Sequence, residues 1–160
     1  MKSFLLVTIL FLFQSYKLLA QNLYPEKFSG CVTNAFALEG HIQTQSNKDT
    51  LLQAFLSNIP EDKLHKLIGI IYIQVIVDSV GNPCCFSIQN KSNTSSEKLK
   101  IDEIVNAKTR WSPPVIEDNI VNKVSAVIKL IFESNKISLE RMGYNGKTGW
   151  VSLEHAYINK

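Results

Sequence analysis

Residues 69–78 read Gly-Ile-Ile-Tyr-Ile-Gln-Val-Ile-Val-Asp, a run dominated by β-branched and aromatic side chains. Every second residue from Ile71 to Val77 is apolar, and this period of two is typical of a half-buried strand. A short loop containing Gly81 follows, and residues 84–89 (Cys-Cys-Phe-Ser-Ile-Gln) form a second strand-like run. The two runs together predict a β-hairpin.

Downstream of this hairpin, the sequence predicts a helix and one further strand. Ile101, Ile104 and Val105 form an apolar face at helical spacing. The helix must end before residues 111–114 (Trp-Ser-Pro-Pro), because proline disfavours helical geometry in the residue ahead of it. Residues 124–132 again alternate between apolar and other side chains. The predicted order is strand, strand, helix, strand.

The first 20 residues are typical of a secretory signal peptide: Lys2, a mainly apolar run at residues 4–13, and a small residue, Ala20. We expect cleavage after Ala20 and a periplasmic or secreted protein. The alternative is an inner-membrane anchor, with membrane contact only if residues 1–20 are retained, although the apolar run is shorter than the roughly 20 residues a spanning helix needs. Lipidation at Cys31 is a third alternative, but this cysteine lies far beyond the apolar run.

The flanking regions carry weaker patterns. An apolar stripe at helical spacing runs from Leu51 to Leu56 and stops near Pro60, which predicts a helix. Asn145-Gly146 is a strong turn dipeptide and predicts a hairpin near the C-terminus. We therefore expect four segments: a signal peptide (1–20), a helical lead-in (21–68), a strand–strand–helix–strand domain (69–133) and a C-terminal tail with a hairpin (134–160).

The charge balance argues against nucleic acid as a partner. The chain has 17 basic and 14 acidic residues, and removal of Lys2 and Lys17 with the signal peptide leaves 15 basic residues. A nearly neutral domain without a basic stripe lacks the electrostatic footprint of a nucleic-acid-binding protein.

An exported protein can form disulfides, and the natural pairing is Cys31 with Cys84 or Cys85. Adjacent strand residues point to opposite faces, so only one of the two neighbouring cysteines can face Cys31. Buried free thiols are the alternative. We expect no metal site, because the sequence has no Cys-x-x-Cys motif and no clustered histidine.

The sequence shows no catalytic motif. His41, His65 and His155 lie in unrelated segments of the sequence and do not form a cluster. There is no phosphate-binding glycine loop, no Gly-x-Ser-x-Gly elbow and no His-Glu-x-x-His. We therefore expect no catalytic residues, no cofactor and no enzymatic activity. Trp111 is expected to close the helix onto the sheet, and Trp150 is a candidate for an exposed anchor.

The order of motifs over residues 69–133 resembles the TonB C-terminal domain family. The resemblance is carried by Asp78 and Gly81 after the first strand, and by Trp111-x-Pro113 after the helix. It implies an α+β fold, with a small antiparallel β-sheet and helices packed on one face. The chain departs from the family pattern because it has no glycine before the last strand.

In that family the last strand lies at a sheet edge and recruits a short segment of an outer-membrane transporter by strand addition. The resemblance therefore implies an exported protein-binding module whose partner is an outer-membrane transporter or another component of a TonB system. A homodimer is an alternative, as is a small secreted structural or inhibitory envelope module that uses another surface. The peptide-binding edge is expected at Val124, Ser125, Val127, Lys129 and Ile131.

Overall fold

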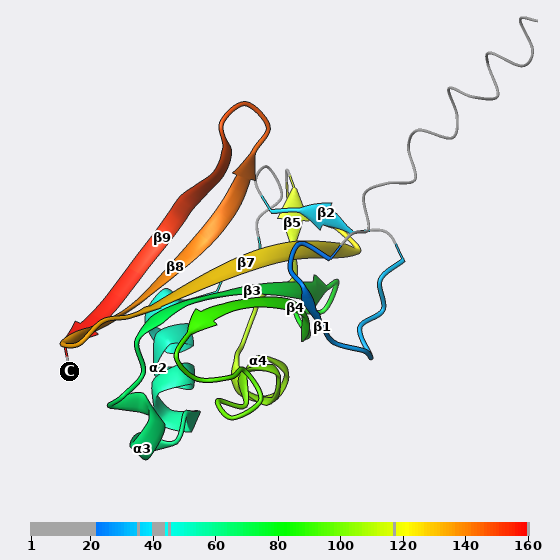
Figure 1. Cartoon of the computed structure of the whole chain (residues 1–160). Helices are drawn as coiled ribbons and strands as arrows, with labels where there is room; N and C mark the ends of the chain where they lie inside the picture. Colours follow the sequence, from blue (N-terminus) through cyan, green and yellow to red (C-terminus); the bar gives the residue numbers. More distant parts are fainter. Residues whose placement is uncertain (1–21, 35, 40–43, 45, 117, 160) are drawn as a thin grey trace, which may run out of the picture.

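The computed structural model describes residues 22–34, 36–39, 44, 46–116 and 118–159 (Figure 1). The expected signal peptide and His41 lie outside the described residues. Within the described ranges, no helix is long and apolar enough to cross a membrane. The chain forms a mixed α+β structure built on a mostly antiparallel sheet with few helices.

The sheet has the strand order β1-β4-β3-β7-β8-β9, and β2 pairs in parallel with β7. The hairpin predicted from residues 69–89 and the strand predicted at residues 124–132 are present as β3, β4 and β7. Two short strands form a separate small ribbon before β7. The strand bounds are β1 Glu26–Lys27, β2 Ala37–Leu38, β3 Gly69–Asp78, β4 Pro83–Ser92, β5 Val115–Ile116, β6 Asn119–Ile120, β7 Lys123–Phe132, β8 Lys136–Asn145 and β9 Gly149–Asn159.

Helices α2 (Lys48–Asn58) and α4 (Ile101–Lys108) cover one face of the sheet, and α3 (Glu61–Leu64) is a short turn between α2 and β3 (Figure 1). The side chain of Asn47 caps α2 by accepting the backbone N–H groups of its first turn. The apolar stripe of α2 and the face of α4 that includes Ile104 pack with the period-two face of β3 in one core. Both helices predicted from apolar periodicity are therefore confirmed.

The opposite face of β3 is also buried at Gln74 and Ile76, which corrects the expectation of a half-buried strand. Residues 22–34 and 36–39 lie over this face, where Gln74 and Ile76 are 0% and 3% exposed. The Gln74 carboxamide accepts the backbone N–H of Leu23 and donates to the hydroxyl of Ser125. A buried amide is tolerated because its hydrogen bonds are made within the protein.

A disulfide between Cys31 and Cys84 holds this N-terminal segment to the sheet, which is one of the two predicted pairings. A bulge between Gln74 and Val75 in the pairing with β4 inserts Phe86 as an extra residue. Cys84 therefore faces the N-terminal segment, whereas Cys85 joins the helix-side core as a buried free thiol.

The expected peptide-binding edge is not an edge, and this prediction was wrong. Strand β7 pairs with β3 along its whole length and with β8 from Val127 to Phe132. Near its start, β7 also pairs with β2 at two positions, where Ala37 lies beside Val124 and Leu38 beside Ser125. The cause lies in β8 and β9, which form the hairpin predicted at Asn145-Gly146 and extend the sheet instead of ending as a separate tail. All five expected edge residues, Val124, Ser125, Val127, Lys129 and Ile131, therefore have strand partners on both sides.

Candidate functional site

Strands β7 and β8 separate beyond Val127, and Glu39 lies in the fork between them. The β8–β9 hairpin diverges from β7 toward its turn (Figure 1). The backbone N–H of Glu39 donates to the Ser125 carbonyl at 3.0 Å, and its own carbonyl accepts the N–H of Tyr144 at 2.6 Å. Backbone pairing on both sides therefore fixes the position of Glu39 between the two strands.

The Glu39 side chain forms a buried ion pair with Arg141 of β8. The side chains are only 1% and 3% exposed, and Oε1 of the glutamate accepts from both the guanidinium and the backbone N–H of Thr44. The guanidinium carbon also lies 5.1 Å from the centre of the Trp111 ring, within the range of a cation–π contact. Burial raises the pKa of the Glu39 carboxyl above its ordinary value, although Arg141 and the Thr44 N–H act to lower it.

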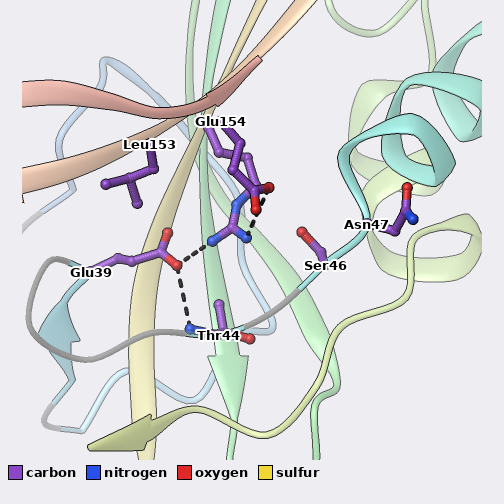
Figure 2. Close-up of a pocket in the computed structure, with 7 residues that line it drawn as sticks. Glu39, Thr44, Ser46, Asn47, Leu153 and Glu154 are labelled. Carbon is purple, nitrogen blue, oxygen red and sulfur yellow. Dashed lines mark hydrogen bonds and ion pairs between the residues drawn. The ribbon is translucent and has the colours of Figure 1, made fainter. Parts of the chain in front are cut away.

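Beside this pair is a cavity of about 460 Å³, which we call the Glu39–Arg141 cavity (Figure 2). Three of the residues that line the cavity each carry a buried polar atom without a hydrogen-bond partner among the described residues: Glu39 Oε2, Arg141 Nε and Ser46 Oγ. The exposed residues Asn47, Leu153 and Glu154 also line the cavity. Because a buried polar atom without a partner costs about 1–3 kcal/mol, this arrangement indicates a site for a small polar group.

The motif residues of the TonB resemblance meet near this cavity. The Asp78 carboxylate accepts the backbone N–H groups of Val80 and Asn82 and shapes the turn after β3. Gly81 has φ of +87°, and a Cβ there would overlap the carbonyl oxygen of Trp111. Two residues further on, Pro113 is half-buried. Asp78, Gly81 and Trp111 therefore join the β3–β4 turn to the segment after α4.

Trp111 closes α4 onto the sheet, as predicted, and is not an open ligand platform. Its ring is 9% exposed, and its indole N–H donates to the hydroxyl of Thr109 at 2.9 Å. The carbonyl of the next residue, Ser112, accepts the hydroxyl of Thr44 at 2.6 Å. The segment after α4 therefore packs against Arg141 through the Trp111 ring, and it is hydrogen-bonded to the loop before α2 through the Ser112 carbonyl.

Glu39 and Arg141 are the residues that sequence reasoning missed. They are separated by 102 positions, and neither belongs to a recognisable motif. The one available signal is local: Arg141 follows Ile137 and Leu139 at period two, so it occupies an inward position of β8. A charged residue at an inward position requires a buried partner.

One edge of the sheet is formed by β9, and no strand in the described ranges pairs with its far side; the short β1 stands at the other end. This strand is 11 residues long and carries exposed apolar side chains at Leu153, Tyr157 and Ile158. Trp150, the expected exposed anchor, is half-buried against the ring of Tyr144 at 5.6 Å. It lines a hollow of about 260 Å³ on the face opposite the helices, with Leu23, Tyr24, Tyr72, Gln89, Val127 and Met142.

The other titratable candidates are dispersed. His65 is exposed and 3.7 Å from Glu61, while His155 is exposed and stacks on Tyr157. Burial raises the pKa of the Cys85 thiol, which keeps it protonated and poorly nucleophilic. Among the described residues, no group of three or more His, Cys, Asp or Glu side chains could hold a metal ion.

Comparisons of the chain with family models, with curated proteins and with solved structures found no match.

Proposed function

We propose that the chain is an exported, TonB C-terminal-like module that binds a protein partner by strand addition at the outer edge of β9. The partner is an outer-membrane transporter or another component of a TonB system. Two observations support the family part of this proposal: the order β3, β4, α4, β7, and the packing of Gly81 against Trp111. Export rests on the signal-peptide pattern of residues 1–20.

The observation that carries the proposal is the position of β9 at the end of the sheet. An unpaired edge presents a row of backbone N–H and C=O groups to any extended segment. Natural edges are usually short or protected by charge, whereas this edge is 11 residues long and has Tyr157 and Ile158 exposed at 61% and 40%. Strand β9 therefore takes the role that the resemblance assigned to β7.

A second candidate is a secreted structural or inhibitory module that uses the hollow around Trp150. Two tyrosines, Tyr24 and Tyr72, lie beside it with ring centres 5.9 Å apart, so the hollow offers aromatic surface of the kind enriched at protein interfaces. Strand addition and this alternative use different residues, so crosslinking groups placed at those residues distinguish the two candidates.

The test is site-specific photo-crosslinking of the full chain in its native host. A photoreactive benzoylphenylalanine replaces Tyr157 on β9, Trp150 at the hollow, or Val80 as an exposed control 69% accessible to solvent. Strand addition predicts a discrete protein adduct at Tyr157 and none at Val80. An adduct at Trp150 without one at Tyr157 supports the second candidate and contradicts the first.

A hydrogen-exchange measurement then tests the mode of binding, with a synthetic peptide of the cross-linked segment as the probe. Pairing at the edge should slow exchange of alternate backbone amides of β9 and leave the amides of β7 unchanged, because β7 is already paired on both sides. Uniform protection of β9, or none, would exclude strand addition. An intact mass of the exported protein, expected to begin at Gln21, tests signal-peptide cleavage.

A further inference from the structure

The buried ion pair of the Glu39–Arg141 cavity has two polar atoms without a hydrogen-bond partner among the described residues. Glu39 Oε2 is an acceptor without a donor, and Arg141 Nε carries an N–H without an acceptor, among the described residues. Glu39 Oε1 accepts two hydrogen bonds, Arg141 Nη2 donates to Glu39, and Arg141 Nη1 lies 3.9 Å from Glu154 Oε2. Ser46 Oγ adds a hydroxyl that can donate or accept. A matching ligand must offer one donor and one acceptor.

The charges around the cavity favour a neutral ligand. Glu39 and Arg141 already neutralise each other, and the other charged residue in the lining, Glu154, is exposed, so a further buried charge would have no buried counterion there. A carboxylate would face Oε2 of Glu39, and an ammonium group would face the guanidinium of Arg141. Because an uncompensated buried charge costs several kcal/mol, both ions are disfavoured.

A primary carboxamide is neutral and offers both a donor and an acceptor. Its carbonyl oxygen can accept the N–H of Arg141 Nε, and its NH₂ can donate to Glu39 Oε2, with one N–H left for Ser46 Oγ. The donor and the acceptor stand on separate atoms of the carboxamide, so one group can bond to both side chains. No bond is made or broken in this interaction.

The cavity lies beside the proposed docking edge. A bulge between Arg141 and Met142 shifts the register with β9, so that Arg141 lies opposite Glu154 while Met142 lies opposite Ser152. Leu153 is the extra residue, and both Leu153 and Glu154 line the cavity (Figure 2). They are exposed, whereas Glu39 and Arg141 are buried. The cavity thus runs from the buried ion pair to the strand that a partner segment would join.

We propose that the Glu39–Arg141 cavity receives the carboxamide of an asparagine or glutamine side chain carried by the partner segment that pairs with β9. This inference rests on the proposed function, because the segment must lie along β9. Side chains of an added strand alternate between the two faces of the sheet, so one of them points to the helix side next to Leu153 and Glu154. The cavity then selects the residue at that position.

The chemistry of the cavity can be tested without a partner, using propionamide, the side-chain analogue of glutamine. The readout is the Nε–H resonance of Arg141 in ¹H–¹⁵N NMR spectra of the full mature chain. Propionamide should shift this resonance in a saturable way. Propionate, n-butylammonium and butanone should bind at least about tenfold more weakly, because propionate and n-butylammonium are charged and butanone has no hydrogen-bond donor. Equal or tighter binding of either ion would overturn the proposal, as would an Arg141 resonance that does not respond to propionamide.

Variants at the rim and at the buried pair provide the controls. Leu153→Trp obstructs the cavity from an exposed position and should abolish the propionamide shift, whereas Glu154→Gln should preserve it. Arg141→Lys removes the Nε donor. If this variant does not fold, Ser46→Ala takes its place as the test. Ser46→Ala removes one predicted hydrogen bond and should weaken propionamide binding severalfold in a folded protein. Unaltered binding to both Leu153→Trp and Ser46→Ala would place the ligand elsewhere.

A second arm uses the synthetic peptide of the cross-linked segment. Replacing its asparagine or glutamine at the position nearest Leu153 by leucine should weaken binding by about tenfold or more, because Glu39 Oε2 and Arg141 Nε lose their partners. If that substitution has no effect while β9 amides remain protected, this inference is wrong and strand addition stands. If propionamide binds but no segment pairs with β9, the proposed function fails, and with it the assignment of the carboxamide to a partner segment.

Discussion

The carboxylate of Glu39 and the guanidinium of Arg141 form an ion pair that is almost completely removed from water, with side-chain exposures of 1% and 3%. The pair joins the fork between β7 and β8 to the inward face of the C-terminal hairpin. Such a pair contributes little net stability relative to a well-packed apolar pair, but the loss of one partner leaves a buried charge. It therefore ties the correct placement of residue 39 to the correct register of β8.

Removal of one member of this pair should be strongly destabilising. We expect Arg141→Met to lower the free energy of unfolding by about 3–5 kcal/mol, as measured by urea titration, because Glu39 is then left without its counterion. The matched control is Lys129→Met, which breaks the partly exposed Lys129–Glu140 pair, whose side chains are 21% and 20% exposed. This control should cost no more than about 1 kcal/mol. Equal costs for the two variants would contradict the buried-pair assignment.

Gly81 should not tolerate a side chain. Its φ of +87° is unfavourable for other residues, and a Cβ would overlap the Trp111 carbonyl. Gly81→Ala should therefore reduce the free energy of unfolding by at least about 2 kcal/mol in thermal or urea unfolding. Gly146→Ala is the control, because nothing lies within 4 Å of its ideal Cβ position, and its effect should stay within about 0.5 kcal/mol. A smaller effect at Gly81 than at Gly146 would show that the turn is not held against Trp111.

Local periodicity was sufficient to predict β3, β4, β7, α2 and α4. The pattern is clearest in β3, with period two from Ile71 to Val77, and in α2, with helical spacing in the stripe from Leu51 to Leu56. The hairpin signalled by Asn145-Gly146 was predictable for the same reason, because a turn signal is local; the loop itself comprises residues 146–148, between the paired Asn145 and Gly149.

Long-range pairing determined the features that sequence reasoning missed. Strand β8 begins as an alternating run, but Arg141 interrupts its apolar face, and the partner that makes this burial tolerable is 102 residues away. The burial of Gln74 likewise depends on the segment containing Leu23, which the disulfide holds in place. Strand β7 lies inside the sheet because residues 136–145 pair with it as β8. The alternation within β7 does not show which strands lie beside it.

The disulfide makes a simple prediction about cysteine reactivity. Native protein under non-reducing conditions should incorporate no iodoacetamide, and denatured non-reduced protein should incorporate one label at Cys85, since Cys31 and Cys84 are bonded and Cys85 is buried. Intact mass spectrometry distinguishes these states. A Cys31→Ser, Cys84→Ser double variant should lose about 2–5 kcal/mol of stability. Labelling of Cys31 or Cys84 before reduction would refute the assigned bond.

The Asp78 turn predicts a pH dependence of stability. Partial burial of Asp78 opposes its ionisation, but the hydrogen bonds from the backbone and side chain of Asn82 and the backbone of Val80 outweigh it and hold the pKa below the ordinary 3.8. The folded protein then binds fewer protons than the unfolded chain between that lowered pKa and 3.8, so stability rises with pH through this interval.

Asp78→Asn should therefore be less stable than the unsubstituted protein by a constant amount above about pH 5. Below pH 3.8, the ordinary value for this carboxyl, the gap should narrow as the folded-state carboxylate becomes protonated. Urea titrations of both proteins across this range measure the gap directly, and Asp102→Asn, at an unrelated position in the first turn of α4, serves as the control. A gap that stays the same from neutral pH to roughly pH 2.5 would mean that the ionised carboxylate does not hold the turn, since the titrating contribution must vanish below both pKa values.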